Sequence, residues 1–360
     1  MEELNFSKTF LESQKRSDKL VHEIDTTPEK FRVLTGDRPT GSLHLGHYFG
    51  SLKNRVLLQQ KGMELFVVIA DYQVLTDHTE FDKIAQNTRE LVLDYLSVGL
   101  NPESGRTFIF PHSHVPELNQ LLVPFLTLVS NAELERNPTV KEEIQASGLS
   151  AVNAGMFVYP VHQAADILSV GGNVVPVGKD QLPHVEMTRT IARRFNKKFS
   201  PQTPVFEEPV ALLSQTVSLM GLDGVQKMSK SRNNAIMLKA TRDEIVQKVK
   251  KATTDCERMI TYEPQRRPQV ANLLRLISVM DGRPADKIAS LIGDAGAKAL
   301  KEMLIETACD FLRPIQEKRK MYEQDPAYVC SVLRRGVDRA RQKASETLSK
   351  TLRAMNMESF

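Results

Sequence analysis

Short apolar runs separated by longer segments of helical periodicity constrain the fold of this chain more than any other feature. The runs are rich in Val, Ile, Leu or Phe, are bounded by Gly, Pro or Asp, and cover residues 31–34 (ended by Gly36), 65–70, 107–110 and 174–177. Such runs are typical of parallel strands buried on both faces. Between them apolar residues recur at helical spacing, as in Leu45, Phe49, Leu52 and Val56, and later in Leu91, Tyr95 and Val98. Strands alternating with helices predict an α/β fold with a parallel sheet covered on both faces.

The ends of the chain differ from this pattern. Residues 1–30 are mixed and charged, and predict a short helix or a loose extension. Thr241 and Glu244 fit a capping box, and the residues after it read as successive helices. The sequence therefore predicts an α/β domain over residues 31–244, followed by an all-α C-terminal domain over residues 245–360.

Composition excludes few functions. A length of 360 residues fits two or three domains, and a net charge of +4 is too small to indicate nucleic-acid binding by itself. No run of about 18 apolar residues predicts a membrane span, and the acidic N-terminus does not resemble a signal peptide, so we expect a cytosolic protein. Cys256, Cys309 and Cys330 are widely separated, which favours buried or half-buried thiols in a reducing compartment.

A first motif, PTGSLHLGH at residues 39–47, follows the first predicted strand and opens a helix. Glycines at such a turn let a nucleotide approach the backbone, and a helix N-terminus favours phosphate. His44 and His47 share a helix face, so two imidazole donors can stabilise charge on a phosphate in its transition state. Taken alone, HxGH equally suits two surface or capping histidines.

A second motif, KMSKS at residues 227–231, lies in a polar loop after Gly221 and Gly224. Lys227 and Lys230 can hold a departing pyrophosphate as flexible point charges. A KxxK pair by itself also suits a solvated basic loop.

Together, the HLGH turn and the KMSKS loop resemble the two signatures of class I aminoacyl-tRNA synthetases. The resemblance implies a Rossmann-like catalytic domain that joins an amino acid to AMP from the magnesium complex of ATP. It assigns stabilisation of carboxylate attack on the α-phosphate to His44, His47, Lys227 and Lys230. It also implies that Gly46 lets the adenine lie against the backbone.

Further stretches resemble the tryptophanyl-tRNA synthetase family. The strongest is residues 175–196, with VPVGKDQ at its start, and residues 253–255, 272–274 and 312–317 support it in the helical part. The family uses the aspartate of an AADIL stretch to accept the indole N–H, which assigns that role to Asp166. A carboxylate only accepts and indole offers one donor, so the chemistry agrees. Asp166 could instead cap a helix or form a salt bridge.

The segment YPVHQAADIL at residues 159–168 is the predicted side-chain pocket, since Tyr159, Gln163 and Asp166 share one helix face. The predicted tryptophan-binding residues are Tyr159, Gln163, Asp166 and Gln181. The predicted ATP-binding residues are Arg38, Pro39, Thr40, Gly46, His47, Gly178, Lys179, Asp180, Lys227, Met228, Ser229, Lys230 and Ser231. No protein-held metal is expected. The chain also has no obvious room for an editing domain, which fits tryptophan or tyrosine.

The resemblance carries further expectations about partners. It implies tRNA(Trp) as the acceptor, with residues 245–360 binding the anticodon and a mobile KMSKS loop over residues 221–234. It also implies a homodimer formed through an insertion at about residues 101–172, and a cytoplasmic location.

Some positions depart from the common bacterial pattern. Arg38, Gln73, Gln163 and residues 137–143 resemble instead the second, divergent type of bacterial tryptophanyl enzyme. Gln163 also resembles the tyrosyl pocket, so a tyrosyl-tRNA synthetase is the near alternative.

Two more distant alternatives remain. They are an HxGH nucleotidyltransferase that adenylylates a small acid without tRNA, and a non-catalytic RNA-binding paralogue. The discriminating feature is a basic cluster in the helical domain, which either faces RNA or forms an ordinary solvated helix face. Its members are Arg334, Arg335, Arg339, Arg341 and Lys343.

Overall fold

The computed structural model describes residues 2–77, 81–147, 152–213 and 219–357. Residues 148–151 of the predicted insertion, and the extreme ends of the predicted N-terminal and C-terminal segments, lie outside the described residues.

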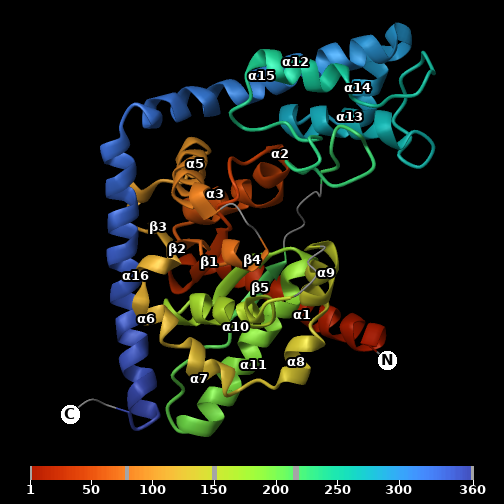
Figure 1. Cartoon of the computed structure of the whole chain (residues 1–360). Coiled ribbons are helices and arrows are strands. Elements are labelled where there is room, and N and C mark those ends of the chain that lie inside the picture. The colour runs from red at the N-terminus through yellow and green to blue at the C-terminus, as the bar shows by residue number, and fades with distance from the viewer. Residues whose placement is uncertain (1, 78–80, 148–151, 214–218, 358–360) are drawn as a thin grey trace.

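Five parallel strands form one sheet in the order β3-β2-β1-β4-β5 (Figure 1). They are β1 (Arg32–Asp37), β2 (Glu64–Ile69), β3 (Thr107–Pro111), β4 (Val174–Val177) and β5 (Val210–Leu213). Successive side chains enter opposite cores, with Val33 and Leu65 in one and Leu34 and Phe66 in the other. Both faces are therefore buried, as the continuous apolar runs predicted. The α/β fold and four of its strands are confirmed.

Two details of the sheet differ from the prediction. Gly36 does not end the first strand, because β1 continues to Asp37. A Cβ at Gly36 would lie 2.0 Å from the Val68 carbonyl oxygen, so the glycine permits close packing against β2. The fifth strand, β5, was not predicted, although its four apolar residues form a run like the one that predicted β4.

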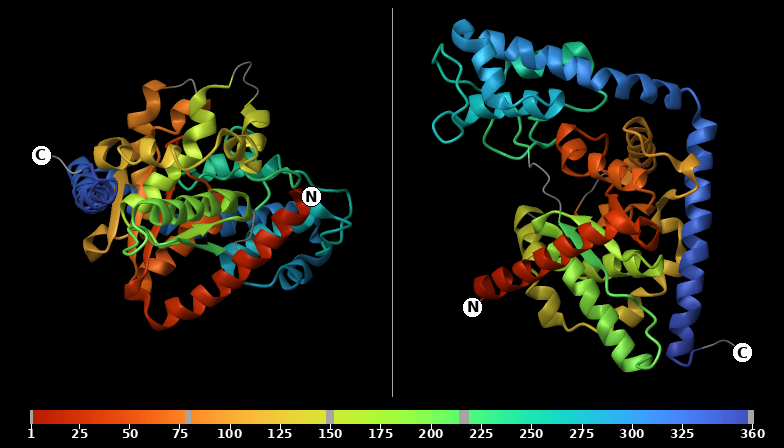
Figure 2. Two further views of the ribbon diagram at one scale, coloured as in Figure 1. Left: turned by 90° about the horizontal axis from the view of Figure 1, so that it is seen from below. Right: turned by 180° about the vertical axis from the view of Figure 1, so that it is seen from behind.

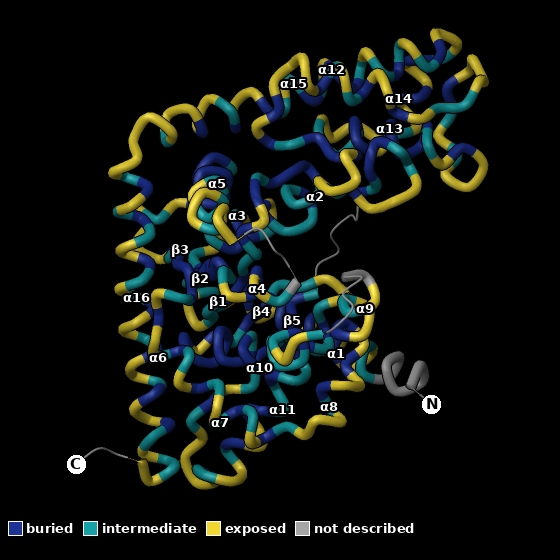
Figure 3. The backbone as a smooth tube through the Cα atoms, viewed as in Figure 1, coloured by how far each residue is buried: buried dark blue, intermediate teal, exposed yellow. Residues whose placement is uncertain are grey.

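Helices cover both faces of the sheet. On one face lie α2 (Leu45–His47), the π-helical turn η2 (Tyr48–Leu52), α3 (Lys53–Gln60) and α5 (Ile84–Ser97). On the other lie α6 (Pro116–Asn119), α7 (Leu122–Leu126), α8 (Asn131–Glu135), α10 (Ala154–Ser169) and α11 (Leu182–Phe199). Shorter connections include α4 (Val74–Asp77), α9 (Pro138–Ser147), η1 (Pro28–Lys30), η3 (Phe81–Lys83), η4 (Pro102–Ser104), η5 (His112–His114) and η6 (Lys179–Gln181). In Figure 3 the strands are buried or half-buried between these layers.

The N-terminal segment forms one long helix, α1 (Glu2–Thr26), so the expected short helix or loose extension is wrong. It packs against β5, with Leu20 and Ile24 buried, and the Leu213 N–H donates to Ser17 Oγ at 2.9 Å. The helix thus covers one edge of the sheet and satisfies a backbone donor there.

The predicted helical region is confirmed as α12 (Arg242–Lys250), α13 (Pro268–Asp281), α14 (Ala285–Ile292), η7 (Gly293–Ala295), α15 (Gly296–Glu323) and α16 (Pro326–Ala354). The predicted capping box is also present, since the Glu244 N–H donates to Thr241 Oγ1 and the Thr241 N–H donates to Glu244 Oε2. Helices α12 to α15 pack on one another above the sheet.

Helix α16 returns along the other edge of the sheet, against β3, so α1 and α16 lie on opposite sides (Figure 2). The contact is close because α16 presents Gly336, with Ala340 and Ala344 buried on later turns. A Cβ at Gly336 would lie 1.9 Å from the Ile109 carbonyl oxygen. The two edges of the sheet are therefore both covered.

Most of the predicted RNA-facing basic cluster is used within the chain. Arg335 pairs with Glu103, Arg339 with Glu64 at 2.8 Å, and Arg341 with Glu117 at 2.8 Å. Lys343 pairs with Glu346 on its own helix at 2.9 Å. The carboxylates of the first three lie on or beside the sheet, so these arginines hold α16 to the catalytic domain. Since the Arg335 and Arg341 side chains are still about half exposed, the interpretation of this cluster as an RNA-facing surface stays a prediction.

Two smaller observations complete the fold. Cys256 and Cys330 are exposed and only Cys309 is half-buried, so the expectation of buried thiols is wrong for two of the three. Among the described residues, no helix combines the length and apolar character needed to cross a membrane.

Candidate active site

Two adjoining cavities open at the carboxyl ends of β1, β2 and β4. The larger, about 1160 Å³, is lined by the turn after β1, the segment after β4 and the KMSKS loop. The smaller, about 370 Å³, is lined by the strand ends and one face of α10. Arg38, Ser51, Gly178 and Gln181 line both, so they form the junction. Ligands of parallel α/β sheets bind at this edge.

The structure brings together nearly all of the predicted site residues. The larger cavity is lined by the four predicted catalytic residues and by every predicted ATP-binding residue except Pro39, which is buried. The smaller cavity is lined by all four predicted tryptophan-binding residues, Tyr159, Gln163, Asp166 and Gln181.

The HLGH turn is fixed by backbone pairing with the segment that follows the KMSKS loop. The Leu45 N–H donates to the Ile236 carbonyl at 3.0 Å, and the Leu238 N–H donates to the Leu43 carbonyl at 2.9 Å. Two motifs far apart in sequence are therefore held side by side. Gly41 has φ +118°, and a Cβ there would lie 2.3 Å from Lys230 Nζ, so glycine allows both the turn and the approach of that lysine.

One buried and one half-buried carboxylate hold the turn on the side away from the cavity. Asp94 Oδ2 accepts the Leu43 N–H at 2.6 Å, and Glu90 Oε2 accepts the Ser42 hydroxyl at 2.8 Å. Arg319, which reaches in from α15, pairs with both carboxylates. The helical region is thereby connected to the residues next to His44.

The two histidines are neutral hydrogen-bonding groups. Burial, with His47 nearby, lowers the pKa of His44 to about 3, and burial also lowers the pKa of His47. His47 Nδ1 accepts the His44 N–H at 3.2 Å, which leaves the proton on Nε2. His47 can thus donate from Nε2 without carrying a charge. The rings lie 3.8 Å apart, as their three-residue spacing predicted.

Asn234 shapes the KMSKS loop. Its Oδ1 accepts the Ser229 N–H at 2.7 Å, and its Nδ2 donates to Asp223 Oδ2 at 2.6 Å. Met228 is buried against the HLGH turn, where a Cβ at Gly46 would lie 3.3 Å from the Met228 Cβ. The Lys227 and Lys230 side chains are exposed to the cavity, and Lys230 Nζ reaches the Thr40 carbonyl at 3.4 Å. The positive charges of the loop therefore lie over the first turn.

The GKDQ segment forms η6 and leads into α11. Thr139 Oγ1 donates to the Asp180 carbonyl at 2.7 Å, so the divergent 137–143 segment supports this loop. Lys179 Nζ lies 4.8 Å from the centre of the Phe10 ring, a cation–π contact with α1.

The side-chain pocket is lined by polar groups of α10 that have partners behind them. The Tyr159 hydroxyl bonds to His184 Nε2 at 3.0 Å, and His184 Nδ1 bonds to Asn137 at 3.3 Å. Asp166 is buried, and its Oδ1 accepts from His112 Nδ1 at 3.0 Å. The carboxylate is thus paired, and its second oxygen has no partner among the described residues.

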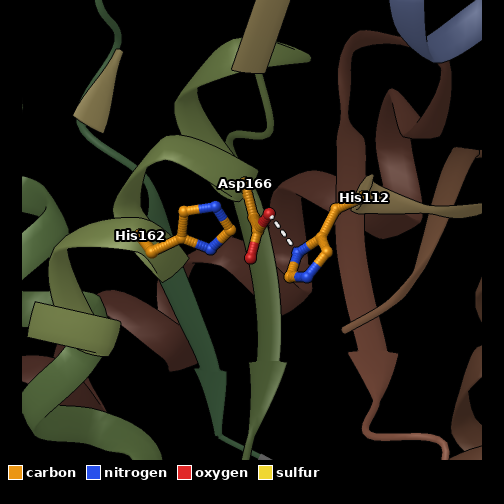
Figure 4. Close-up of side chains that lie close together, drawn as sticks. All are labelled: His112, His162 and Asp166. Carbon is orange, nitrogen blue, oxygen red and sulfur yellow. Dashed lines mark hydrogen bonds and ion pairs between the residues drawn. The ribbon is translucent and has the colours of Figure 1, made fainter. Parts of the chain in front are cut away.

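His112, His162 and Asp166 lie close enough to suggest a metal site, with ligand atoms within 4.8 Å of one another (Figure 4). Hydrogen bonds already use the ring nitrogens. His112 donates from Nδ1 to Asp166 and accepts the Tyr72 N–H at Nε2, at 3.0 Å. Both His162 nitrogens bond to side-chain amides. The cluster therefore fits a hydrogen-bonded pocket wall.

Several lining residues were missed. Asp37 ends β1, and its Oδ2 accepts from Arg55 at 2.6 Å and from the Tyr95 hydroxyl at 2.7 Å. His112 lines neither cavity, but it directly follows β3 and bonds to Asp166, and its position next to a strand's carboxyl end could have been found from sequence. Gln73, after β2, had been noted only as a departure from the common pattern.

Comparison with known proteins agrees with this geometry. The sequence model of the family described as tRNA synthetases class I (W and Y) matches residues 26–313. A tryptophan–tRNA ligase of Streptococcus mutans is 42% identical over 91% of this chain and 98% of its own length. A crystal structure of tryptophanyl-tRNA synthetase from Campylobacter jejuni with ADP and tryptophan has a TM-score of 0.79 and 30% identity, covering 91% of this chain and 100% of that one.

A tyrosyl-tRNA synthetase structure from Aeropyrum pernix, at 19% identity and a TM-score of 0.63, is similar in fold alone. The match over residues 26–313, together with the two signature loops around one cavity, places the chain in a known group: it belongs to the class I tRNA synthetases of the tryptophan and tyrosine family.

Proposed function

We propose that this chain activates L-tryptophan with ATP to give tryptophanyl-adenylate and pyrophosphate, and then transfers the amino acid to tRNA(Trp) with release of AMP. One observation carries the proposal. The cavity that holds both signature loops opens, through Arg38, Ser51, Gly178 and Gln181, into a smaller cavity with the buried carboxylate of Asp166 on its wall. The curated relative at 42% identity, named a tryptophan–tRNA ligase, supports the same choice of amino acid.

The two cavities support one placement of the substrates. ATP, as its magnesium complex, occupies the larger one, with its phosphates between the HLGH turn and the KMSKS loop. The ring of tryptophan enters the smaller cavity, and its carboxylate stays at the junction. This arrangement holds the carboxylate next to the α-phosphate and turns a bimolecular attack into an intramolecular one.

The transition state is stabilised by neutral donors on one side and cations on the other. The Nε2–H of His47 donates to a phosphoryl oxygen, because its Nδ1 is occupied by the backbone. Lys227 and Lys230 neutralise the departing pyrophosphate as it gains charge. Pyrophosphate then leaves from the exposed side, where these lysines lie.

The remaining parts of the proposal concern partners. The helical region 245–360 binds the anticodon arm of the tRNA, while α16 within it also anchors to β3. We also propose a cytoplasmic homodimer that uses the insertion around residues 101–172. In support, Val123 of α7 is exposed in this insertion, with a side chain of 69% relative accessibility.

Pyrophosphate exchange into ATP tests the activation step, run with tryptophan, tyrosine, phenylalanine or no amino acid. Exchange with tryptophan alone, followed by charging of a tRNA(Trp) transcript, is the expected result. Exchange with tyrosine instead would favour a tyrosyl enzyme and would mean that Gln163 indicates the substrate better than Asp166 does. Protein that binds ATP but exchanges with none of the three would contradict the proposal.

A further inference from the structure

The side-chain oxygen of Gln73 is an unused, buried acceptor on a residue that lines the smaller cavity. Gln73 lies between β2 and α4, is 8% exposed, and lines this cavity. Its Oε1 is buried and has no hydrogen-bond partner among the described residues. Buried amide oxygens are nearly always paired, because an unpaired one costs free energy. The position therefore calls for a donor that a ligand brings.

The orientation of the Gln73 amide is determined by a chain of hydrogen bonds. Asn119 Nδ2 donates to the Val115 carbonyl at 3.4 Å, so Asn119 Oδ1 accepts from His162 Nε2 at 2.7 Å. The proton of His162 thus lies on Nε2, and its Nδ1 must accept. Gln73 Nε2 donates to that Nδ1 at 3.0 Å. With its nitrogen held in this way, Gln73 presents oxygen, not nitrogen, as its remaining polar group.

Gln73 also lies at the end of the cavity that takes the amino-acid ring. The nucleotide end is marked by the residues that line both cavities, and Gln73 is not among them. Its partner His162 is one helical turn from Asp166 on α10 and belongs to the same buried cluster. Gln73 and Asp166 are therefore on neighbouring parts of one wall.

We propose that Gln73 Oε1 accepts a hydrogen bond from the ring N–H of the bound amino acid, and that Gln73 is thus a specificity-determining residue beside Asp166. The inference rests on the proposed function, since it takes tryptophan as the ligand. One Asp166 oxygen already accepts a hydrogen bond from His112, which leaves the other for a ligand. The Gln73 amide oxygen adds a second acceptor beside it. A single N–H shared between two acceptors is a common three-centre arrangement.

The test compares two substrates that differ in one donor. L-Tryptophan has the ring N–H, whereas β-(3-benzothienyl)-L-alanine has sulfur in its place. Pyrophosphate exchange is measured with both, for the full chain and for Gln73→Met, which keeps the side chain's length and removes its acceptor. We expect kcat/KM for tryptophan to fall about 5- to 100-fold while that for the analogue changes little. Gln324→Met, the same change at an exposed position after α15, should leave both values unchanged.

A second variant tests the orientation without touching the cavity wall. Asn119→Leu removes the acceptor for His162, so the imidazole can change tautomer and the Gln73 amide can turn over. We expect this variant to lose part of the preference for tryptophan over the analogue, whereas Asn119→Asp, which retains an oxygen acceptor, should keep most of it. Thermal unfolding of each variant identifies any that fails to fold.

The outcomes separate this inference from the proposed function. An unsubstituted chain without tryptophan-dependent exchange would overturn the proposed function itself. If that chain is active, but in folded Gln73→Met kcat/KM falls equally for both substrates or for neither, the acceptor role of Gln73 is wrong. An unchanged preference in folded Asn119→Leu would overturn the hydrogen-bond chain that orients the amide.

Discussion

Removing the Arg319 side chain should lower the free energy of unfolding strongly, although Arg319 lies in α15, outside both cavities. It is 3% exposed, and it pairs with the fully buried Asp94 and with Glu90. Arg319→Met keeps most of the apolar stem but leaves the Asp94 carboxylate with the Leu43 N–H as its remaining partner. Breaking a buried ion pair in this way costs about 3–5 kcal/mol. At about 2 °C per kcal/mol for a chain of this size, the melting temperature should fall by about 6–10 °C.

The loss of stability in Arg319→Met comes mainly from the unpaired charge of Asp94, so a second substitution that removes this charge should restore part of it. Burial already raises the pKa of Asp94 to about 6 with Arg319 in place, so the carboxylate is poorly tolerated without the guanidinium. Asn at position 94 keeps an oxygen for the Leu43 N–H but carries no charge. The double variant Arg319→Met/Asp94→Asn should therefore be destabilised by at least about 1 kcal/mol less than the sum of the single changes.

The assay is thermal and urea unfolding of the four proteins in this cycle, with Arg313→Met as the control. Arg313 lies on the same helix, but it is exposed and, among the described residues, its ion pair is with exposed Asp310, so its loss should change the free energy of unfolding little. A loss below about 1 kcal/mol for Arg319→Met, or strict additivity in the cycle, would refute the argument that the buried charge dominates.

Three further outcomes are expected. Lys230→Ala should slow tryptophan activation about 100-fold or more and leave tryptophan binding nearly unchanged, and equal losses in rate and binding would contradict its transition-state role. Gly336→Ala should destabilise the chain by about 1–3 kcal/mol in urea unfolding, because the new Cβ meets the Ile109 carbonyl, and a neutral effect would contradict the close docking of α16. The Arg194 hydrogen bond lowers the pKa of Glu133 to about 2. The stability that this ion pair contributes is therefore complete above about pH 4.5 and is lost as the pH falls toward 2. Unfolding of Glu133→Gln against pH should show a smaller acid-induced loss than the unsubstituted chain, and parallel curves would count against this ion pair.

The sequence predicted most of the sheet and most of the residues that gather around the two cavities, because local patterns encode both. Strands buried on two faces are continuously apolar, and the site residues lie in short motifs next to strand ends. β5 was missed although its run VALL is as apolar and as short as the run that predicted β4, so an apolar run of four residues is a weak signal in either case. The break at Gly36 was misplaced because a glycine can mark a turn or a close backbone contact, and only the position of Val68 decides which.

Charged residues were harder to interpret, because their role depends on partners distant in sequence. Arg335 and Arg341 pair with Glu103 and Glu117, which lie more than 200 residues earlier, and nothing in the local sequence indicates these partners. The orientation of Gln73 is equally hidden, since it depends on the tautomer of His162 and hence on an asparagine in another helix.

The same dependence on distant partners explains why the two signatures work as one site. Neither the HLGH turn nor the KMSKS loop could position a phosphate alone, because each is short and glycine-bearing. Residues 236–238 bond to residues 43–45, so any movement of the backbone behind the KMSKS loop is transmitted to the turn that carries His44. On the opposite side, the turn is bonded to Asp94, which Arg319 of α15 neutralises. The HLGH turn is thus connected to α15 through a buried, charged contact and to the KMSKS side through backbone hydrogen bonds.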